Sequence, residues 1–89
     1  NRKKTILIIS DMNVEIADAI MDEVGRGATF LEGAGAYTGQ EKKVLFVVVT
    51  LTQIAKIKLI AEKMDPHAFM IVQDAAEVLG HGFSVKKRS

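Results

Sequence analysis

The chain has 89 residues, of which 48% are hydrophobic and 26% are charged, with a net charge of +1 and no cysteine. This length supports one small domain with a single core, and the composition excludes a disordered chain. The missing cysteine excludes disulfides, a thiol nucleophile and thiolate metal ligands, and it favours a reducing compartment. Every apolar stretch is far shorter than the ~20 residues of a membrane-spanning helix.

The charges are unevenly placed along the chain. Half of the 12 basic residues lie near the two ends, at positions 2–4 and 86–88, while all 11 acidic residues lie between Asp11 and Glu77. An acidic body lacks the concentrated basic face that nucleic acid requires, so we expect no nucleic-acid partner. The basic ends fit either an anionic membrane surface or a solubilising role.

The two halves of the chain repeat one pattern without a gap, as when Lys3 aligns with Lys43 and Ile20 with Ile60. Each half predicts strand, helix, strand, which together make a ferredoxin-like βαββαβ sandwich of the α+β class. In that topology a four-stranded antiparallel sheet has the strand order 4-1-3-2, and both helices cover one face. The expected single domain spans residues 4–83, with basic, flexible ends at 1–3 and 84–89.

The first half of the sequence predicts a strand, then a helix, then a second strand. Residues 4–9 are apolar on both alternating faces, as in a buried central strand. A helix is expected over residues 13–24 because its apolar side chains form one stripe, and Gly25 suits the left-handed backbone that ends a helix. Residues 28–32 are expected to form the second strand.

The second half follows the same plan after a glycine-rich hairpin connection at residues 33–40. Thr50 and Gln53 predict a capping box at the start of the second helix, which Asp65-Pro66 ends. The remaining expected elements are a strand at 43–49, a strand at 68–73 and a short helical turn at 74–79.

One face of this sheet is expected to carry no helix. Because both central strands are apolar on each side, aliphatic side chains would meet water there unless something covers them. We therefore expect a homo-oligomer that buries this face, while a further segment of a longer chain is the competing cover. The opposite orientation of the first strand, with Ile6 and Ile8 on this face, stays open. The predicted interface residues are Leu7, Ile9, Leu45, Val47 and Val49.

The hairpin is a candidate binding site for a small anionic ligand. Its glycines could let amide groups close around a phosphate, with Tyr37 stacking on a base and Thr38 donating a hydrogen bond. Glycines in a hairpin more often serve a bulge or a positive φ, and an arginine in a turn is more often solvated. The candidate ligand-binding residues are Gly33, Gly35, Tyr37, Thr38, Gly39, His67 and Arg26.

No catalytic or metal site is expected. His67 and His81 have no partner at the spacing of metal ligands, and the chain has no cysteine. The available hydroxyl groups lack any sequence context that marks a nucleophile. We therefore predict a protein that is not an enzyme and uses no cofactor.

Residues 31–45, with the sequence LEGAGAYTGQEKKVL, carry a more specific pattern. Together with Gly25-Arg26-Gly27 and Glu77-Val78-Leu79-Gly80, they resemble the cytosolic C-terminal domain of the YitT family of bacterial membrane proteins, whose own role is uncharacterised. The resemblance covers about residues 4–83. It implies transmembrane helices before Asn1 in the parent protein and a location on the cytoplasmic side of the cell membrane.

The same resemblance implies a fold similar to the PII signal proteins, which are trimers of ferredoxin-like units that bind nucleotides between subunits. By that analogy the expected oligomer is a trimer. The leading functional prediction is a non-enzymatic regulatory module that assembles through its sheets and senses a small anionic ligand or nucleotide between subunits. A pure oligomerisation module without a ligand is the second hypothesis, and a small enzyme of unknown reaction is the third.

Overall fold

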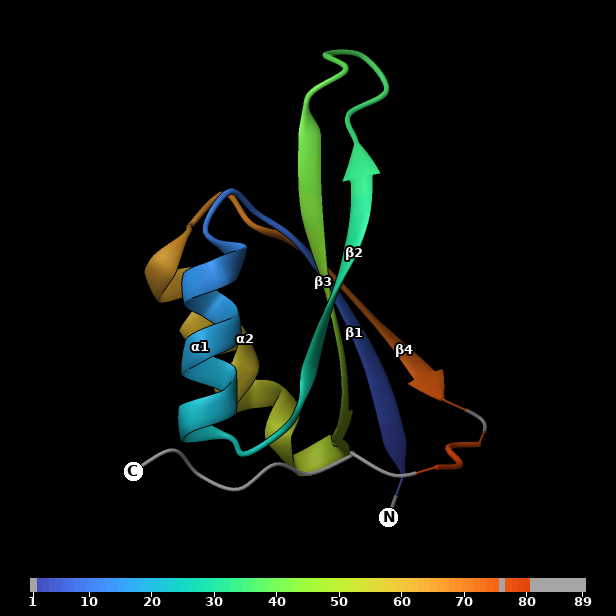
Figure 1. The fold of residues 1–89 in the computed structure, drawn as a ribbon. Helices are drawn as coiled ribbons and strands as arrows, with labels where there is room; N and C mark the ends of the chain where they lie inside the picture. The colour runs from blue at the N-terminus through green and yellow to red at the C-terminus, as the bar shows by residue number, and fades with distance from the viewer. Residues whose placement is uncertain (1, 76, 81–89) are drawn as a thin grey trace.

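A computed structural model of the chain describes residues 2–75 and 77–80. The first half contains strand β1 (Lys3–Ile9), helix α1 (Asn13–Glu23) and strand β2 (Ala28–Ala34). The second half contains strand β3 (Glu41–Thr50), a single 3-10 turn η1 (Leu51–Gln53), helix α2 (Ile54–Met64) and strand β4 (Phe69–Ala75). This order of elements confirms the repeated strand, helix, strand pattern (Figure 1).

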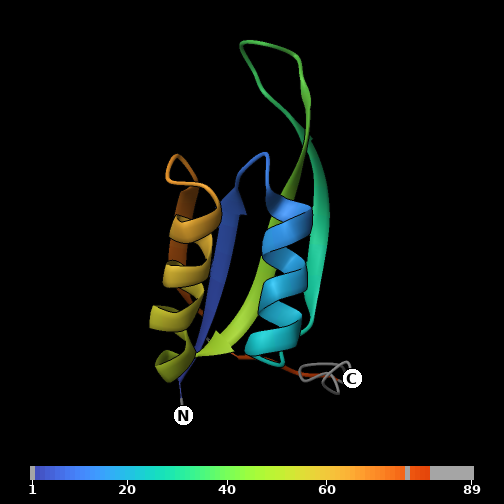
Figure 2. The same cartoon turned by 90° about the vertical axis from the view of Figure 1, so that its left-hand side faces the viewer.

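The four strands form one antiparallel sheet in the order β2-β3-β1-β4. This order is the predicted 4-1-3-2 read from the other edge, and it confirms the ferredoxin-like α+β architecture. Both helices lie side by side on the same face of the sheet (Figure 2). Among the described residues, no helix or strand covers the opposite face.

The core lies between the sheet and the two helices. An aliphatic side chain buried there contributes about 1.5–3 kcal/mol relative to an exposed one, so this layer is the main source of folding free energy. Its largest fully buried side chains come from β1, β3 and the inner stripes of the helices: Ile6, Ile8, Ile16, Ile20, Leu45, Ile57, Val47 and Val49.

Two predicted features of the helix ends are confirmed. Gly25 follows α1 with a φ of +76°, a backbone conformation that glycine adopts without the steric cost of a Cβ. At the start of the second helical segment, the Thr50 backbone N–H donates to the Gln53 side-chain Oε1 at 2.9 Å, and the two residues form the expected capping box.

Two local predictions are wrong. The expected helical turn at 74–79 is absent, because Asp74 and Ala75 continue β4 and residues 77–79 adopt neither helix nor strand. The register with β1 explains the longer strand, since Asp74 lies opposite Lys4 and forms an ion pair with it.

Lys3, expected in a flexible end, is the first residue of β1. The other predicted end, residues 84–89, and His81 lie outside the described residues.

The β2–β3 hairpin extends beyond the other two strands as a two-stranded arm (Figure 1). The pairing of β1 with β3 ends at the Ile9–Val44 pair, whereas the pairing of β2 with β3 continues to Ala34 and Glu41. We refer to residues 32–43 as the arm. The arm has only two strands, and an isolated two-stranded hairpin is marginally stable in water.

Asn13, the first residue of α1, holds the sheet at the point where β3 passes the end of β1. Its side chain is 2% exposed, and its Nδ2 donates to the Ile8 carbonyl oxygen at 2.9 Å and to the Lys43 carbonyl oxygen at 2.6 Å. One amide group of α1 therefore binds the backbone of both central strands, β1 and β3.

We expect the substitution Asn13→Ala to lower the free energy of unfolding by roughly 2 kcal/mol or more, because each buried polar group left without a partner costs about 1–3 kcal/mol. Urea unfolding at one protein concentration measures this. Val14→Ala is the matched control, since Val14 is the next residue and is 50% exposed. Equal stabilities of the two variants would contradict the role given to Asn13.

Candidate functional site

The open face, meaning the side of the sheet away from the helices, consists of side chains that the strand register places in rows. The first row, nearest the arm, contains Phe69, Ile9, Val44 and Leu31. The second row contains Ile71, Leu7, Phe46 and Thr29. The third row contains Gln73, Thr5 and Val48. The open face is therefore apolar over its first two rows and more polar toward the end of the sheet that carries Lys3.

The apolar side chains of the first row are poorly covered in the single chain. Phe69 is 58% exposed, Leu31 is 43% exposed and Ile9 is 37% exposed. Soluble monomers seldom expose a continuous apolar patch built from several neighbouring strands. The open face is therefore the part of the described surface most suited to contact with another molecule.

The predicted interface residues are divided between the two sides of the sheet. Leu7 and Ile9 lie on the open face, as expected. The assignment of Leu45, Val47 and Val49 to this face is wrong, since these side chains are buried in the core beneath the helices. The cause is the register: residues directly opposite each other share a face, and the partner of Leu45 is Ile8 in the core.

The glycine-rich hairpin forms the tip of the arm and satisfies several of its own backbone groups. The Gly35 N–H donates to the Gln40 carbonyl oxygen at 2.9 Å, and the Gly39 N–H donates to the Gly35 carbonyl oxygen at 2.8 Å. The Thr38 hydroxyl accepts from the Gln40 N–H at 3.2 Å. These amide groups close the turn and do not form an open cradle. Tyr37 is fully exposed at the tip, with its ring free to meet a partner.

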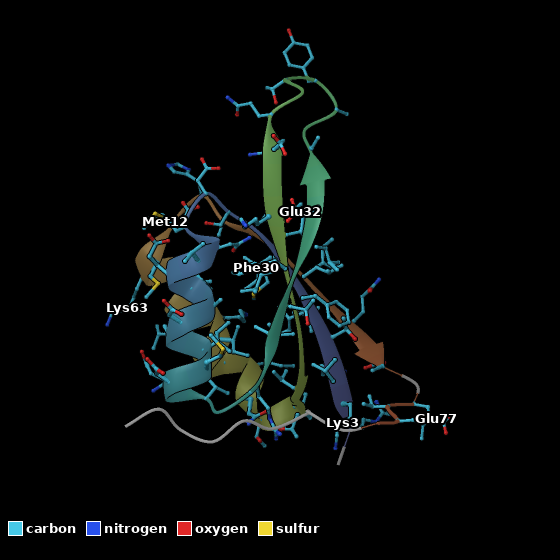
Figure 3. The ribbon with its side chains drawn as sticks, viewed as in Figure 1. Lys3, Met12, Phe30, Glu32, Lys63 and Glu77 are labelled. Carbon is cyan, nitrogen blue, oxygen red and sulfur yellow. The ribbon has the colours of Figure 1, made fainter. Side chains whose placement is uncertain are left out.

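The structure does not bring the predicted ligand residues into one site. Arg26 lies between α1 and β2, at the end of the sheet marked by Lys3 in Figure 3, and its Nε donates to Gln53 Oε1 at 2.9 Å. His67 lies at the opposite end, where its backbone N–H donates to Asp65 Oδ1 at 2.9 Å. The hairpin tip extends further beyond that end (Figure 1). Arg26 therefore cannot share a ligand with the hairpin of its own chain.

Asp65 joins the two connections at the end of the sheet that carries the arm. The Ser10 hydroxyl donates to Asp65 Oδ2 at 2.6 Å and accepts from the Met12 N–H at 2.9 Å. The hydrogen bond from Ser10, followed by that from the His67 N–H, lowers the pKa of the Asp65 carboxyl group. The lowered pKa makes the Asp65 carboxylate a weak base, so this hydrogen bond anchors the two loops and gives Ser10 no strong base to activate it.

A shallow hollow of about 210 Å³ lies beside this loop, where the arm leaves the body of the sheet. One wall is the segment from Ser10 to the start of α1, and the other is residues 41–43 of β3. Lys42 Nζ lies 3.5 Å from Asp11 Oδ1, so the charges of the two walls partly neutralise each other. Within residues 2–75 and 77–80, no group of three or more carboxylate or histidine side chains could hold a metal ion.

The sequence comparison assigns the family. Residues 26–80 match the family described as "Uncharacterized protein conserved in bacteria (DUF2179)". The chain belongs to the DUF2179 family. It is also similar to the UPF0750 membrane protein YxkD of Bacillus subtilis, with 41% identity over 83 residues, which cover 93% of this chain and 30% of YxkD. The UPF0750 membrane protein YitT of B. subtilis is 28% identical over 78 residues. The predicted resemblance to the YitT family is therefore confirmed.

Solved structures of similar proteins support the DUF2179 fold. The crystal structure of a DUF2179 protein from Eubacterium ventriosum has a TM-score of 0.72 and 32% sequence identity, covering 82% of this chain and all of that one. A functionally unknown protein from Pediococcus pentosaceus has a TM-score of 0.71 at 16% identity, over 90% of this chain and 97% of that one, which shows a shared fold only.

The DUF2179 chain described here spans less than a third of YxkD and YitT. In the described part of the chain, no helix has both the length and the apolar character needed to cross a membrane.

Several open-face residues were not identified from the sequence, namely Leu31, Val44, Phe46, Phe69 and Ile71. The sequence shows which of these side chains share a face within one strand, but it does not show which face that is. Two side chains on the same strand share a face when they are two residues apart, so Val44 and Phe46 exclude Leu45 from their face. What the sequence lacked was the cross-strand register, which decides which set faces the helices.

We expect acid to destabilise the domain partly through Asp65. A carboxyl group whose pKa is lowered in the folded state contributes stability above its ordinary pKa of about 4, and that contribution is lost as the pH falls through the lowered value. The Asp74 carboxyl group contributes stability over the same pH range, because the hydrogen bond and the charge of Lys4 lower its pKa.

The variant Asp65→Asn should be less stable than the parent at neutral pH, and the difference should shrink as the pH falls below about 4. Urea unfolding across this pH range measures it. Ser10→Ala should reproduce part of the effect, since it removes the main hydrogen bond to the carboxylate. Parallel stability curves for the parent and Asp65→Asn would be inconsistent with this assignment.

Proposed function

We propose that this DUF2179 domain is a non-enzymatic regulatory module of a bacterial membrane protein, and that it assembles by burying the open face against further copies of itself. The observation that carries the proposal is the apolar character of the first two rows of the open face. Seven of their eight side chains are apolar and come from all four strands. Removing such a surface from water is the main driving force of protein association.

A second copy of the domain suits this surface for an electrostatic reason. The first two rows contain no charged side chain. The open faces of several copies can therefore meet around a shared axis without burying an unpaired charge, which would oppose association. A trimer, with the domain on the cytoplasmic side of the membrane, is the assembly that we propose from the resemblance to the PII proteins.

The proposal is tested by comparing Ile71→Asp with Val72→Asp. The two residues are neighbours in β4 and are 36% and 40% exposed, but they point to opposite sides of the sheet. We expect Ile71→Asp to give a monomer, because association would bury a carboxylate in an apolar contact. Val72→Asp should retain the assembly of the parent.

Gel filtration with light scattering measures the mass of each variant, and circular dichroism checks that each is folded. A parent chain that is monomeric at micromolar concentration would contradict the proposal. So would an Ile71→Asp variant that keeps the mass of the parent assembly. The mass of the parent also distinguishes a trimer from other assemblies.

A small anionic ligand at the arm is a second proposal, supported by the full exposure of Tyr37 at a tip whose shape is held by internal hydrogen bonds. An aromatic ring presented in this way can stack on a base or another planar group. Thr38 lies at the same tip, while Gly35 and Gly39 use their N–H groups to hold the turn and Gly33 lies in the adjoining part of β2. Arg26 and His67 could contribute only from a neighbouring subunit or a separate site.

Thermal-shift measurements with nucleotides and inorganic phosphate test the ligand. A compound at about 100 times its dissociation constant should stabilise the folded state by about 2.7 kcal/mol. Tyr37→Ala should abolish the shift, whereas Ala36→Ser, a small change beside it, should preserve it. If a compound that binds the parent also binds Tyr37→Ala unchanged, the arm is not its site. If none binds, the function is oligomerisation without a ligand.

A further inference from the structure

Gly33 occupies a position where nothing in the described chain requires glycine. It lies inside β2, and its φ is not positive, unlike those of Gly25 and Gly39. A Cβ built on Gly33 would lie 3.7 Å from Val44 Cγ2 and 3.9 Å from the Lys42 carbonyl oxygen, which are ordinary van der Waals distances. By contrast, a Cβ on Gly35 would lie 2.6 Å from Thr38 Oγ1. Gly33 therefore has no internal steric reason to be glycine.

A glycine inside a strand weakens it, because the residue adds chain entropy in the unfolded state and contributes no side chain to packing. The weakening is greatest where the strand has few other contacts. Gly33 is in the arm, where β3 no longer pairs with β1 and the two strands of the hairpin have only each other. A glycine inside a strand marks a bulge, a tight bend or a place where a ligand or another backbone approaches closely, and the pairing of β2 with β3 runs past Gly33 without a bulge.

The strand register places Gly33 on the same side as the open face. Its partner across the arm is Lys42, and its neighbour two residues earlier is Leu31 in the first row. Side chains two residues apart point to the same side of a strand. Gly33 thus continues the first row onto the arm as a half-buried position without a side chain, with Lys42 beside it on the same side.

The size of the open face gives a reason for contact to reach the arm. Four strands of seven residues present a projected area of roughly 450 Å², with about 4.8 Å between strands and about 3.3 Å per residue. A standard stable interface buries about 800 Å² on each partner. Contact that continues along the arm, the surface directly continuous with the apolar rows, would bring the buried area closer to this value.

We propose that Gly33 is a contact point at which the main chain of a second copy of the domain packs directly against the arm, extending the contact made by the open face. The inference rests on the proposed self-association. It assigns a specific role to a residue that contributes no side chain: a Cβ at this position would separate the two backbones.

The test compares Gly33→Val and Gly33→Ala with Ala34→Val. Ala34 is the next residue, is exposed, and points to the opposite side of the same strand. We expect Gly33→Val to raise the dissociation constant of the assembly roughly tenfold or more, a loss of about 1.4 kcal/mol. Gly33→Ala should give a smaller increase, and Ala34→Val should stay within about twofold of the parent. Sedimentation equilibrium over a dilution series measures these constants.

A second measurement separates association from folding. At dilutions where all chains are monomeric, Gly33→Ala should unfold at the same temperature as the parent or higher, because its Cβ fits and the strand gains order. Weaker assembly by a subunit of equal or greater stability would support a lost intermolecular contact. A monomer that is less stable than the parent would overturn the inference, because glycine would then be needed within the chain itself.

The remaining outcomes distinguish this inference from the proposed function. If Ile71→Asp is monomeric while Gly33→Val assembles as tightly as the parent, the copies meet on the open face but not at Gly33, and the inference is overturned. If Gly33→Val and Ala34→Val weaken assembly equally, the effect belongs to the strand and the inference is again overturned. If Ile71→Asp retains the parent mass, the proposed function itself fails.

Discussion

The antiparallel pairing of β1 with β3 joins the two halves of the repeated sequence and sets the side on which each central residue lies. With Ile6 opposite Val47 and Ile8 opposite Leu45, one set of aliphatic side chains meets the helices. The other set, which includes the Leu7–Phe46 pair, forms the open face. A slip of one residue in a single strand would exchange its two sets, and a differently shaped set would then have to pack beneath the helices. Asn13 fastens the end of this pairing by binding one carbonyl oxygen from each strand.

Most of the fold could be predicted because its signals are local and occur twice. The apolar stripes of both helices, the left-handed Gly25 and the Thr50–Gln53 capping box depend on residues close together in the sequence. The wrong helical turn at 74–79 shows the limit of such signals. There the pairing of Asp74 with Lys4, residues far apart in the chain, overrides a locally plausible helix and extends β4.

The candidate site was harder to predict because it depends on cross-strand contacts. Leu45, Val47 and Val49 are as apolar as Val44, Phe46 and Val48, so composition could not show which set meets the helices. Only the register with β1 separates them. The same reasoning applies to Arg26 and the hairpin. Both looked suited to an anion, yet α1 and β2 carry them to opposite ends of the domain (Figure 1).

The polar third row has a geometric consequence for any assembly formed through the first two. Gln73 and Thr5 keep favourable contact with water, whereas Phe69 and Ile9 lose unfavourable contact when covered. Neighbouring subunits would therefore touch tightly beside their arms and diverge toward Lys3. Such a splayed arrangement would hold the Lys3 ends of the sheets further apart than the ends that carry the arms.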